Sequence, residues 1–341
     1  MATPDQKFMT AVDIHNKTGP ATSLYLNSST PVPVPGPGEA LIKIHAFGLN
    51  RMDLLQREGH YPLPPSAPST LGVEFSGTVV STNPPNHSSF PAGLPVFGLA
   101  PGGAYAQYLA VSTQLLMPKP AHLSFEQAAA VPETWMTATQ ALHFLLELQP
   151  GQTVLWHAGA SGVSIAGIQL SVAAGAGAVF ATVGSDDKVA FVEGELGATK
   201  GVNYKTGDWV KEVLEATGGR GVDCVVDLVG GGDYFNKNLD VLAKDGRVAV
   251  LGLLGGRVAE RVDVGKLLFK RARVQGSSLR SRSVEYQGKL RERLEEEALP
   301  RFETGEFRVF VERVMPWGEI VEAHQLMEGN QTKGKIVCTV E

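Results

Sequence analysis

The hydrophobic positions from residue 154 to residue 203 follow the pattern of a parallel strand–helix–strand unit. An apolar strand at 154–156 leads into a turn of small residues at 157–164, and a run with helical periodicity follows at 165–174. A second apolar strand comes next, at 178–183. We therefore predict two parallel strands joined by a helix that packs on their sheet.

The turn at 157–164 has the composition of a phosphate-binding loop. Aligned with the fingerprint G-x-G-x-x-G, its key positions are Gly159, Ser161 and Ser164, with Gly162 as a further glycine. Small residues let the backbone approach a pyrophosphate, and the first helical turn supplies unpaired N–H groups. The second strand, about 20 residues on, completes a dinucleotide fingerprint. Tight helix–strand packing without a ligand would give a similar turn. Ser164 is small enough for the third fingerprint position, where a glycine is usual, and its hydroxyl can bond back to the helix.

The alternation of strands and helices continues to residue 273, which predicts a doubly wound parallel sheet of α/β class. Later buried strands are expected at 222–227 and 247–251. Short strands punctuated by glycine and proline come before this region, and a last strand ends the chain. They predict a small barrel-like β domain, with strands at 40–46, 73–80, 102–109, 114–117 and 335–340.

Further helices are indicated by capping residues and by periodicity. Ser124 and Gln127 form a capping box ahead of the alanines at 128–130. Residues 134–148 predict one long helix that ends before Pro150, and residues 290–302 predict one charged amphipathic helix.

The composition is that of an ordinary globular protein, with 43% hydrophobic and 19% charged residues. A formal net charge of -5 and a pI near 5.9 argue against a nucleic-acid partner and an anionic membrane surface. The two cysteines, Cys224 and Cys338, cannot form a disulfide framework or a four-thiolate zinc site. No apolar run has the length of a signal-peptide core or a membrane span, so we expect a cytoplasmic enzyme.

Several short passages, in this order and spacing, resemble the medium-chain dehydrogenase/reductase superfamily. They lie at 49–57, 59–61, 71–77, 128–135, 267–271 and 334–337. More closely, the chain resembles the zinc-free quinone oxidoreductase branch that includes zeta-crystallin. The resemblance implies a Rossmann dinucleotide domain at 133–276 and a GroES-like catalytic β domain at 1–132 with 277–341. It also implies a homodimer.

The residues at the family's zinc positions predict that no metal is bound. In the alcohol dehydrogenases of the superfamily, a cysteine ligand aligns with Asn50 and a histidine ligand aligns with Val73. Neither an amide nor an isopropyl group replaces those donors. Without a Lewis acid, alcohol oxidation loses its main driver, whereas hydride transfer from a reduced cofactor to an electron-poor acceptor remains feasible. His45, His60 and His157 do not form a ligand cluster by spacing, and we expect them to be core or surface residues.

The resemblance implies an NADPH site spread along the chain. The pyrophosphate turn is matched by Ala160, Ser161, Gly162 and Val163, and the adenosine-phosphate loop by Gly184, Ser185 and Lys188, with Tyr204 beside it. The nicotinamide wall is matched by Leu251, Gly252, Leu253 and Leu254, with Ser277, Ser278 and Leu279 nearby. Asn330 and Lys335 match residues that close over the cofactor. Leu251 to Leu254 could also be a buried strand end.

The acids Asp186 and Asp187 bear on the choice of cofactor. An acid after the second strand can bind the ribose hydroxyls of NAD and repel the extra phosphate of NADP. Both acids, however, fall in the first helical turn behind an expected Ser185 cap, where acids favour the helix dipole. We therefore predict NADPH.

Over the nicotinamide, the matching residues are Asn50, Asp53, Tyr61 and Thr137. Tyr61 would orient the acceptor carbonyl or donate a hydrogen bond to it as the hydride arrives. Asn50 can donate an amide hydrogen bond, and Asp53 is expected to organise its loop through hydrogen bonds. The resemblance therefore implies a zinc-independent NADPH reductase of quinones or enones.

Two other functions stay open. An enoyl reductase acting on polyketide or fatty-acyl chains would use the same fold and hydride. A protein that keeps the cofactor for structural purposes, or that binds RNA, would be of a different class. The low pI and the lack of basic stripes interleaved with aromatic residues count against RNA.

Overall fold

The computed structural model describes residues 7–65, 67–83 and 89–341, which fold as two compact units. The first unit combines the chain up to Met136 with Arg280–Glu341, and the second is Thr137–Leu279. The predicted division lay at 132/133 and 276/277. Helix α3 (Pro132–Thr139) runs across the first of the observed boundaries.

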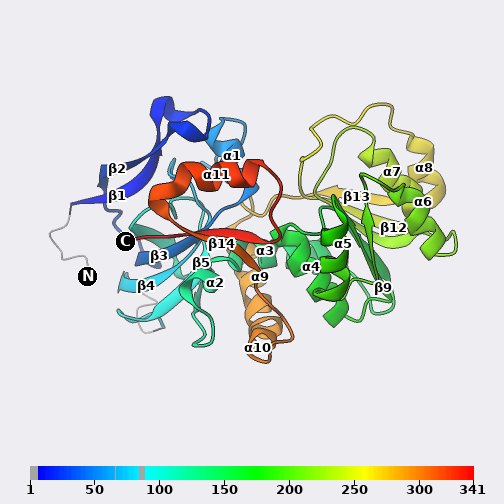
Figure 1. Ribbon diagram of the computed structural model, residues 1–341. Helices are drawn as coiled ribbons and strands as arrows, with labels where there is room; N and C mark the ends of the chain where they lie inside the picture. The colour runs from blue at the N-terminus through cyan, green and yellow to red at the C-terminus, as the bar shows by residue number, and fades with distance from the viewer. Residues whose placement is uncertain (1–6, 66, 84–88) are drawn as a thin grey trace. The chain divides into compact units, whose positions relative to one another are not determined.

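The second unit is built on a six-stranded parallel sheet, which confirms the predicted doubly wound α/β class. Its strand order is β10-β9-β8-β11-β12-β13, the arrangement typical of dinucleotide-binding sheets. Figure 1 shows helices on both sides of the sheet. The strands are β8 (Thr153–Trp156), β9 (Ala178–Val183), β10 (Lys200–Asn203), β11 (Val222–Asp227), β12 (Leu242–Val250) and β13 (Arg273–Gly276). The helices are α4 (Gly162–Ala173), α5 (Asp186–Gly194), α6 (Trp209–Ala216), α7 (Tyr234–Val241) and α8 (Val264–Lys270).

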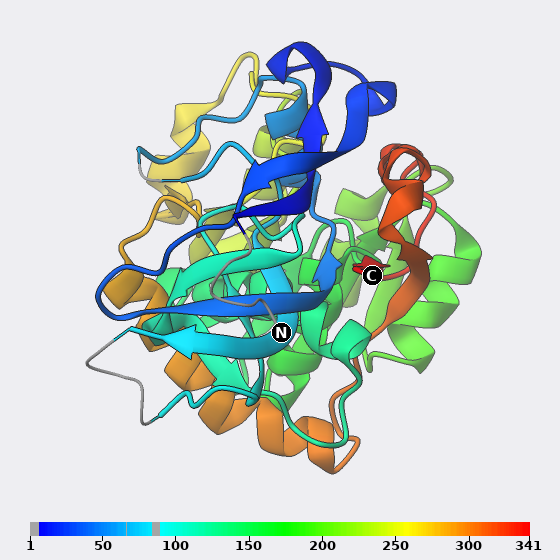
Figure 2. The ribbon, with the colours of Figure 1, turned by 90° about the vertical axis from the view of Figure 1, so that its left-hand side faces the viewer.

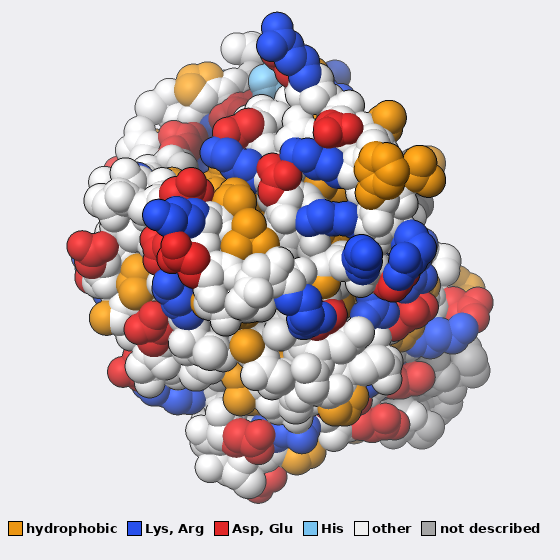
Figure 3. Space-filling view, turned by 90° about the vertical axis from the view of Figure 1, so that its right-hand side faces the viewer, with side chains coloured by type: hydrophobic (Ala, Val, Ile, Leu, Met, Phe, Trp, Pro, Cys, Tyr) orange, Lys and Arg blue, Asp and Glu red, His pale blue; other side chains and the backbone are white. Residues whose placement is uncertain are grey.

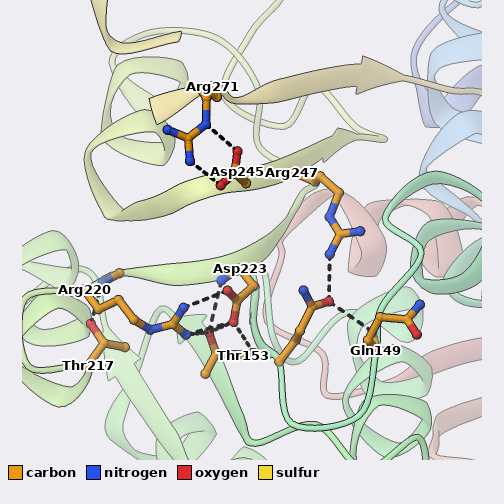
Figure 4. A network of polar contacts seen from close by, with 10 residues as sticks. Gln149, Thr153, Thr217, Arg220, Asp223, Asp245, Arg247 and Arg271 are labelled. Atoms are coloured by element: carbon orange, nitrogen blue, oxygen red, sulfur yellow. Dashed lines mark hydrogen bonds and ion pairs between the residues drawn. The ribbon is translucent and has the colours of Figure 1, made fainter. Parts of the chain in front are cut away.

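The amino ends of β8 and β11 are held together by a polar cluster (Figure 4). Asp223 accepts hydrogen bonds from the backbone N–H and hydroxyl of Thr153, at 2.8 and 2.9 Å. Arg220 donates two hydrogen bonds to the same carboxylate, each of 2.8 Å, and holds the pKa of Asp223 down at about 2. This cluster lies at the amino ends of the strands. The small-residue turn follows β8 and lies at the opposite edge of the sheet, where the strands have their carboxyl ends.

The first unit contains a seven-stranded sheet in the order β14-β15-β3-β4-β5-β7, with β6 paired to β3. Figure 2 shows β3 and β4 side by side, and Ala40, Ile42 and Ile44 of β3 are buried. A two-stranded sheet of β1 (Phe8–Ile14) and β2 (Leu24–Pro31) belongs to the same unit. The strands are β3 (Glu39–Gly48), β4 (Glu74–Thr82), β5 (Pro95–Leu99), β6 (Tyr108–Ser112), β7 (Leu116–Pro118), β14 (Val311–Pro316) and β15 (Lys335–Thr339). The helices are α1 (Arg51–Arg57), α2 (Phe125–Ala129), α9 (Val284–Glu297), α10 (Leu299–Glu303) and α11 (Ile320–Glu328).

Two predicted strands of the first unit were wrong in their bounds. The strand expected at 102–109 begins only at Tyr108, because Gly102 and Gly103 have φ of 158° and 88°, which lie outside the strand region. The strand expected at 114–117 begins at Leu116, after a 3₁₀ turn at Thr113–Leu115.

Two predicted helices are each divided. The helix expected at 134–148 is α3 followed by a π-helical segment, Gln140–Leu145, and Glu147 takes a φ of 49°. The helix expected at 290–302 is α9 and α10, with Pro300 in the first turn of α10, where its missing N–H costs least. The capping box of Ser124 and Gln127 is confirmed at the start of α2. In the part of the chain that the structure describes, no helix has the length and apolar character to cross a membrane.

Candidate functional site

The small-residue turn of the second unit comes closer to β9 than a side chain at residue 159 would allow. A Cβ atom there would lie 2.9 Å from the Cβ of Ala181 and 3.0 Å from Val183. The Gly159 N–H donates to the Thr182 carbonyl at 2.8 Å, which fixes the turn against the strand. Ser161 then caps α4, and the predicted residues Ala160, Gly162 and Val163 lie at this helix start. A twelve-residue helix therefore begins at the carboxyl ends of parallel strands, where such folds bind phosphates.

Ser164, at the third fingerprint position, is fully buried. Its hydroxyl donates to the carbonyl of His157 at 2.7 Å. The same hydroxyl accepts from the hydroxyl of Ser161, the N-cap of α4, at 3.2 Å, so it bonds both to the start of the helix and to the residue after β8. The serine is accommodated by joining helix to strand.

A buried polar chain supports the turn from beneath. His157 contacts Thr182 Oγ1 at 2.8 Å and Asn238 Oδ1 at 2.7 Å, and Asn238 donates to Asp227 at 2.8 Å. The other oxygen of Asp227 accepts from the backbone N–H groups of Val229 and Gly230. His157 is thus a core residue, as expected. Asp227 and Asn238 were missed, although an acid at the end of an apolar strand was a signal for them.

The adenosine-phosphate loop places Gly184 against Tyr204. A Cβ atom at residue 184 would lie 2.9 Å from the Tyr204 hydroxyl and 3.4 Å from Lys205 Cε. Tyr204 is 43% exposed, and Lys188 lies in the first turn of α5. These residues therefore gather at one loop. Lys205 was not predicted, although it directly follows Tyr204.

The two acids of this loop lie in the first turn of α5, as predicted. Ser185 occupies the N-cap position, but its hydroxyl donates to Asp187 at 2.5 Å and caps no backbone N–H, so that part of the prediction was wrong. Asp186 accepts a hydrogen bond of 2.7 Å from the side chain of Asn203, at the end of β10. One oxygen of Asp186 is thereby engaged within the protein.

Residues 251–254 form an exposed apolar loop after β12. Leu253 and Leu254 are 50% and 47% exposed, so the alternative of a buried strand end was wrong for them. A Cβ atom at Gly252 would lie 2.5 Å from the Leu228 carbonyl, which holds this loop close to the end of β11. Ser277 follows β13 and donates its N–H to Val250 at 3.1 Å, and Leu279 is buried. The loop offers an apolar wall at the carboxyl edge of the sheet.

In the first unit, Asp53 is fully buried and accepts three hydrogen bonds. The donors are the N–H of Asn50 at 2.8 Å, the N–H of Gly72 at 3.2 Å and the hydroxyl of Tyr105 at 3.2 Å. Burial raises the pKa of Asp53 to about 6, although these bonds and nearby cations oppose the shift. Asp53 thus joins the start of α1 to two other segments, which is the organising role expected of it.

Asn50 belongs to a buried ionic cluster with Glu74 and Lys335. Lys335 Nζ lies 2.6 Å from Glu74 Oε1, and also donates to Asn50 Oδ1 at 2.8 Å and to the Leu49 carbonyl at 2.5 Å. Asn50 Nδ2 donates to Glu74 at 2.9 Å. The three N–H groups of Lys335 are therefore used inside the protein. Lys335 thus supports Asn50 and Glu74, and its contact with the cofactor stays a prediction.

Glu74 and Glu133 were both missed as members of this cluster. The second oxygen of Glu74 accepts from the N–H of Glu133 at 2.9 Å. Burial, followed by the charge of Glu74, raises the pKa of the Glu133 carboxyl to about 8, although part of its surface is exposed. The signal for Glu74 was a charged residue within an apolar strand pattern.

Tyr61 is half-buried, and the guanidinium carbon of Arg280 lies 5.6 Å from the centre of its ring. Asn330, in the same unit, contacts the guanidinium of Arg51, which also donates to the Met327 carbonyl at 2.9 Å. Thr137 is buried at the start of the second unit. The structure thus places Tyr61, Asn50 and Asp53 in the first unit. The second unit holds the small-residue turn at 157–164, the predicted adenosine-phosphate loop and the apolar loop at 251–254.

The two positions that align with zinc ligands, Asn50 and Val73, carry neither a thiolate nor an imidazole. Val73 is 1% exposed within the apolar core, and the Asn50 amide is bound to Glu74 and Lys335. Among residues 7–65, 67–83 and 89–341, no group of three or more metal-binding side chains is present.

The lack of zinc stays a prediction. We expect chelators to leave the activity of the purified protein intact, because neither an amide in an ionic cluster nor a valine can coordinate zinc. Elemental analysis checks this. About one zinc per chain, lost together with activity, would contradict it.

Comparison with known proteins gives consistent matches for both units. Residues 162–296 match the family model described as zinc-binding dehydrogenase, and residues 36–121 match the alcohol dehydrogenase GroES-like domain, which confirms the predicted GroES-like unit. The chain is 34% identical to quinone oxidoreductase-like protein 2 of Mus musculus over 74% of this chain and 71% of that protein. It is 28% identical to quinone oxidoreductase of Homo sapiens over 97% and 98% of the two chains.

Solved structures agree with these matches. A mycobacterial protein complexed with NADPH has a TM-score of 0.85 and 30% identity, covering 97% of this chain and 99% of that one. The CurK enoyl reductase has a TM-score of 0.83 and 27% identity, covering 98% and 99%.

Proposed function

We propose a function from the premise that the chain belongs to the medium-chain dehydrogenase/reductase superfamily, in its quinone oxidoreductase-like branch. It is thereby an NAD(P)-dependent oxidoreductase. We infer that it is a zinc-independent NADPH reductase of quinones or related conjugated carbonyls. The observation that supports this is the Asn50–Glu74–Lys335 cluster, because it engages the side chain that aligns with a zinc ligand in hydrogen bonds to an ion pair. Within the branch, the passages at 49–57, 59–61, 71–77, 128–135, 267–271 and 334–337 resemble the tumour-suppressor-inducible NADPH quinone oxidoreductase of animals.

The residues of the second unit fit a dinucleotide. The turn at Gly159 and the start of α4 would hold the pyrophosphate, and the exposed Leu253 and Leu254 would cover the apolar nicotinamide face. Lys188 and Tyr204 would bind the adenosine phosphate of NADPH. NADPH supplies a hydride when bound. The protein's own part is to hold the acceptor and provide a proton.

Lys188→Ala should weaken NADPH binding by about 10- to 150-fold, because a charge-assisted bond to phosphate contributes about 1.5–3 kcal/mol. NADH affinity should barely change, since NADH lacks that phosphate. Fluorescence titration with both cofactors measures this, with Lys211→Ala, on the exposed face of α6, as the control. A wild-type protein that prefers NADH would instead make Asp186 the ribose ligand.

The acceptor must be electron-poor, because no Lewis acid is proposed to activate it. Tyr61, half-buried beside Arg280, would donate a hydrogen bond to the oxygen on which negative charge develops. Steady-state NADPH oxidation against quinones, enones and enoyl thioesters tests the proposal. Rapid turnover of an enoyl thioester with no activity on quinones would assign the chain to the enoyl reductases, which its likeness to the CurK enoyl reductase supports as the second candidate.

A cofactor-binding protein without enzymatic activity, or one that binds RNA, is the remaining alternative. Filter binding of RNA with and without NADPH, together with the acceptor panel, separates it from an enzyme. The net charge of -5 opposes RNA binding.

We also propose that the protein forms a homodimer through the β13 edge of the parallel sheet. β13 is the last strand in the sheet order, and the neighbouring helix α8 exposes Val264, Leu268 and Phe269 by 68%, 73% and 77%. Figure 3 shows hydrophobic side chains gathered at the upper right, over α8. An exposed apolar group next to a free strand edge is typical of an interface. Sedimentation equilibrium of the whole chain measures the oligomeric state.

A further inference from the structure

Arg280 is a buried cation without a direct counterion. It is 4% exposed; its Nε donates to the Pro101 carbonyl and its Nη1 to Gln56 Oε1, each at 2.7 Å. Both acceptors are neutral. Within the described part of the chain, Nη2 has no hydrogen-bond partner and no carboxylate lies within ion-pair distance of the guanidinium. A buried arginine ordinarily binds a carboxylate through two parallel bonds, whereas this one has no direct ion pair.

Residue 102, which lies next to Nη2, has no side chain to offer it and little room for one. A Cβ atom at Gly102 would lie 3.0 Å from Nη2 and 3.1 Å from the Pro68 carbonyl. The φ of Gly102, 158°, also disfavours a side chain there. The guanidinium is thus fixed by two hydrogen bonds to neutral acceptors, and its charge can act on groups nearby.

The charge acts on three titratable neighbours. Burial lowers the pKa of Arg280, and the charges of Asp53, Tyr61 and Glu133 oppose that shift. Asp53 is already bound by three donors, and burial raises the pKa of Glu133 to about 8, which favours its neutral form. Tyr61 is the neighbour whose ring faces the guanidinium, at 5.6 Å.

We propose that Arg280 is a positioning residue for the reduction, stabilising the phenolate form of Tyr61 so that its hydroxyl gives a proton to the acceptor oxygen. This rests on the proposed function. As a hydride adds to the acceptor carbon, the electron pair of the carbonyl or its conjugated system moves to oxygen. The O–H bond of Tyr61 breaks, the proton joins that oxygen, and the phenolate takes a proton from water, which reaches the half-exposed ring.

The first test is made on the protein without cofactor. Near-ultraviolet absorbance is measured as a function of pH in wild type and in Arg280→Met. The same curve is measured with Tyr61→Phe added to each protein. Subtracting it leaves the ionisation of Tyr61 alone. We expect Tyr61 in wild type to ionise below about 10, the value of free tyrosine. Arg280→Met should move that ionisation upward by about 1–3 pH units. Arg280→Lys, which keeps a charge, should recover part of the shift.

Gln56→Met is the matched control, because it removes an anchor of Arg280 and keeps the cation. It should leave the Tyr61 titration near that of wild type. In the enzyme with NADPH and an enone, Arg280→Met should lower kcat at least about tenfold at pH 7. The deficit should shrink at high pH, where the wild-type Tyr61 ionises before that of the variant. NADPH affinity should be retained.

Two results would overturn the proposal. One is an unmoved Tyr61 titration in Arg280→Met, which would make Arg280 a structural tie between Pro101 and Gln56. The other is a pKa of Tyr61 in the wild-type protein at or above that of free tyrosine. This second measurement does not depend on whether an arginine variant folds. Failure of the proposed function gives a different result. The enzyme would then oxidise NADPH with none of the acceptors, whereas the Tyr61 titration could still be measured on the protein without cofactor.

Discussion

Replacing Lys335 with methionine should destabilise the folded protein by about 3–5 kcal/mol, the usual cost of removing one partner of a buried ion pair. Lys335 and Glu74 are 5% and 0% exposed, and Nζ is bound by three oxygens. The variant leaves the Glu74 carboxylate buried without a cation, and leaves Asn50 Oδ1 and the Leu49 carbonyl without this donor. Urea denaturation of the whole chain measures the loss.

Lys289→Met is the control for that experiment. Lys289 forms an ion pair with Glu285 at 3.0 Å on an exposed helix face, and such pairs contribute about 0.3–0.5 kcal/mol. Adding Glu74→Gln to Lys335→Met should restore part of the stability, because it removes the unpaired carboxylate. A loss of less than about 1 kcal/mol in Lys335→Met would show that the ion pair is not the determinant we infer.

The second large effect is expected at Tyr61. Tyr61→Phe should lower turnover of an enone by as much as about 10²–10³, the cost of removing a single oxyanion donor. Quinone reduction should fall less, because a reactive acceptor needs less stabilisation of developing charge. NADPH binding should be largely retained, and kcat on both acceptors measures the difference.

Tyr25→Phe serves as the control for this substitution, since the Tyr25 hydroxyl contacts Asp13 on an exposed strand pair. Equal losses on enone and quinone would identify Tyr61 as a packing residue.

The sequence predicted those parts of the fold that are set by local periodicity. The turn at 157–164 and the alternating strands specify a doubly wound sheet, because each strand must bury both faces beneath crossover helices. The capping box at Ser124 was visible for the same local reason. The predicted bounds of a strand were wrong where the backbone conformation, and not the side-chain pattern, decides the structure, as at Gly102 and Gly103.

The candidate site was predictable only in part, because its support comes from contacts between distant residues. Asn50 meets Lys335 across 285 positions, and Arg280 meets Gln56 across 224. No periodicity encodes such pairs. Lys335 was therefore assigned to the cofactor, although its ammonium is bound within the protein. Arg280 and Glu133 were missed for the same reason.

The discontinuous first unit has a consequence for the order in which the chain can fold during synthesis. Asn50, Asp53 and Glu74 leave the ribosome early, whereas Arg280 and Lys335 follow only after the entire second unit, Thr137–Leu279. Until then, Glu74 has no cation and cannot be buried as a carboxylate without a large cost. The second unit is continuous in sequence and can fold first, since domains generally fold as units during synthesis. Strand β15 brings Lys335 into place late, so the Glu74 carboxylate stays hydrated until β15 is made.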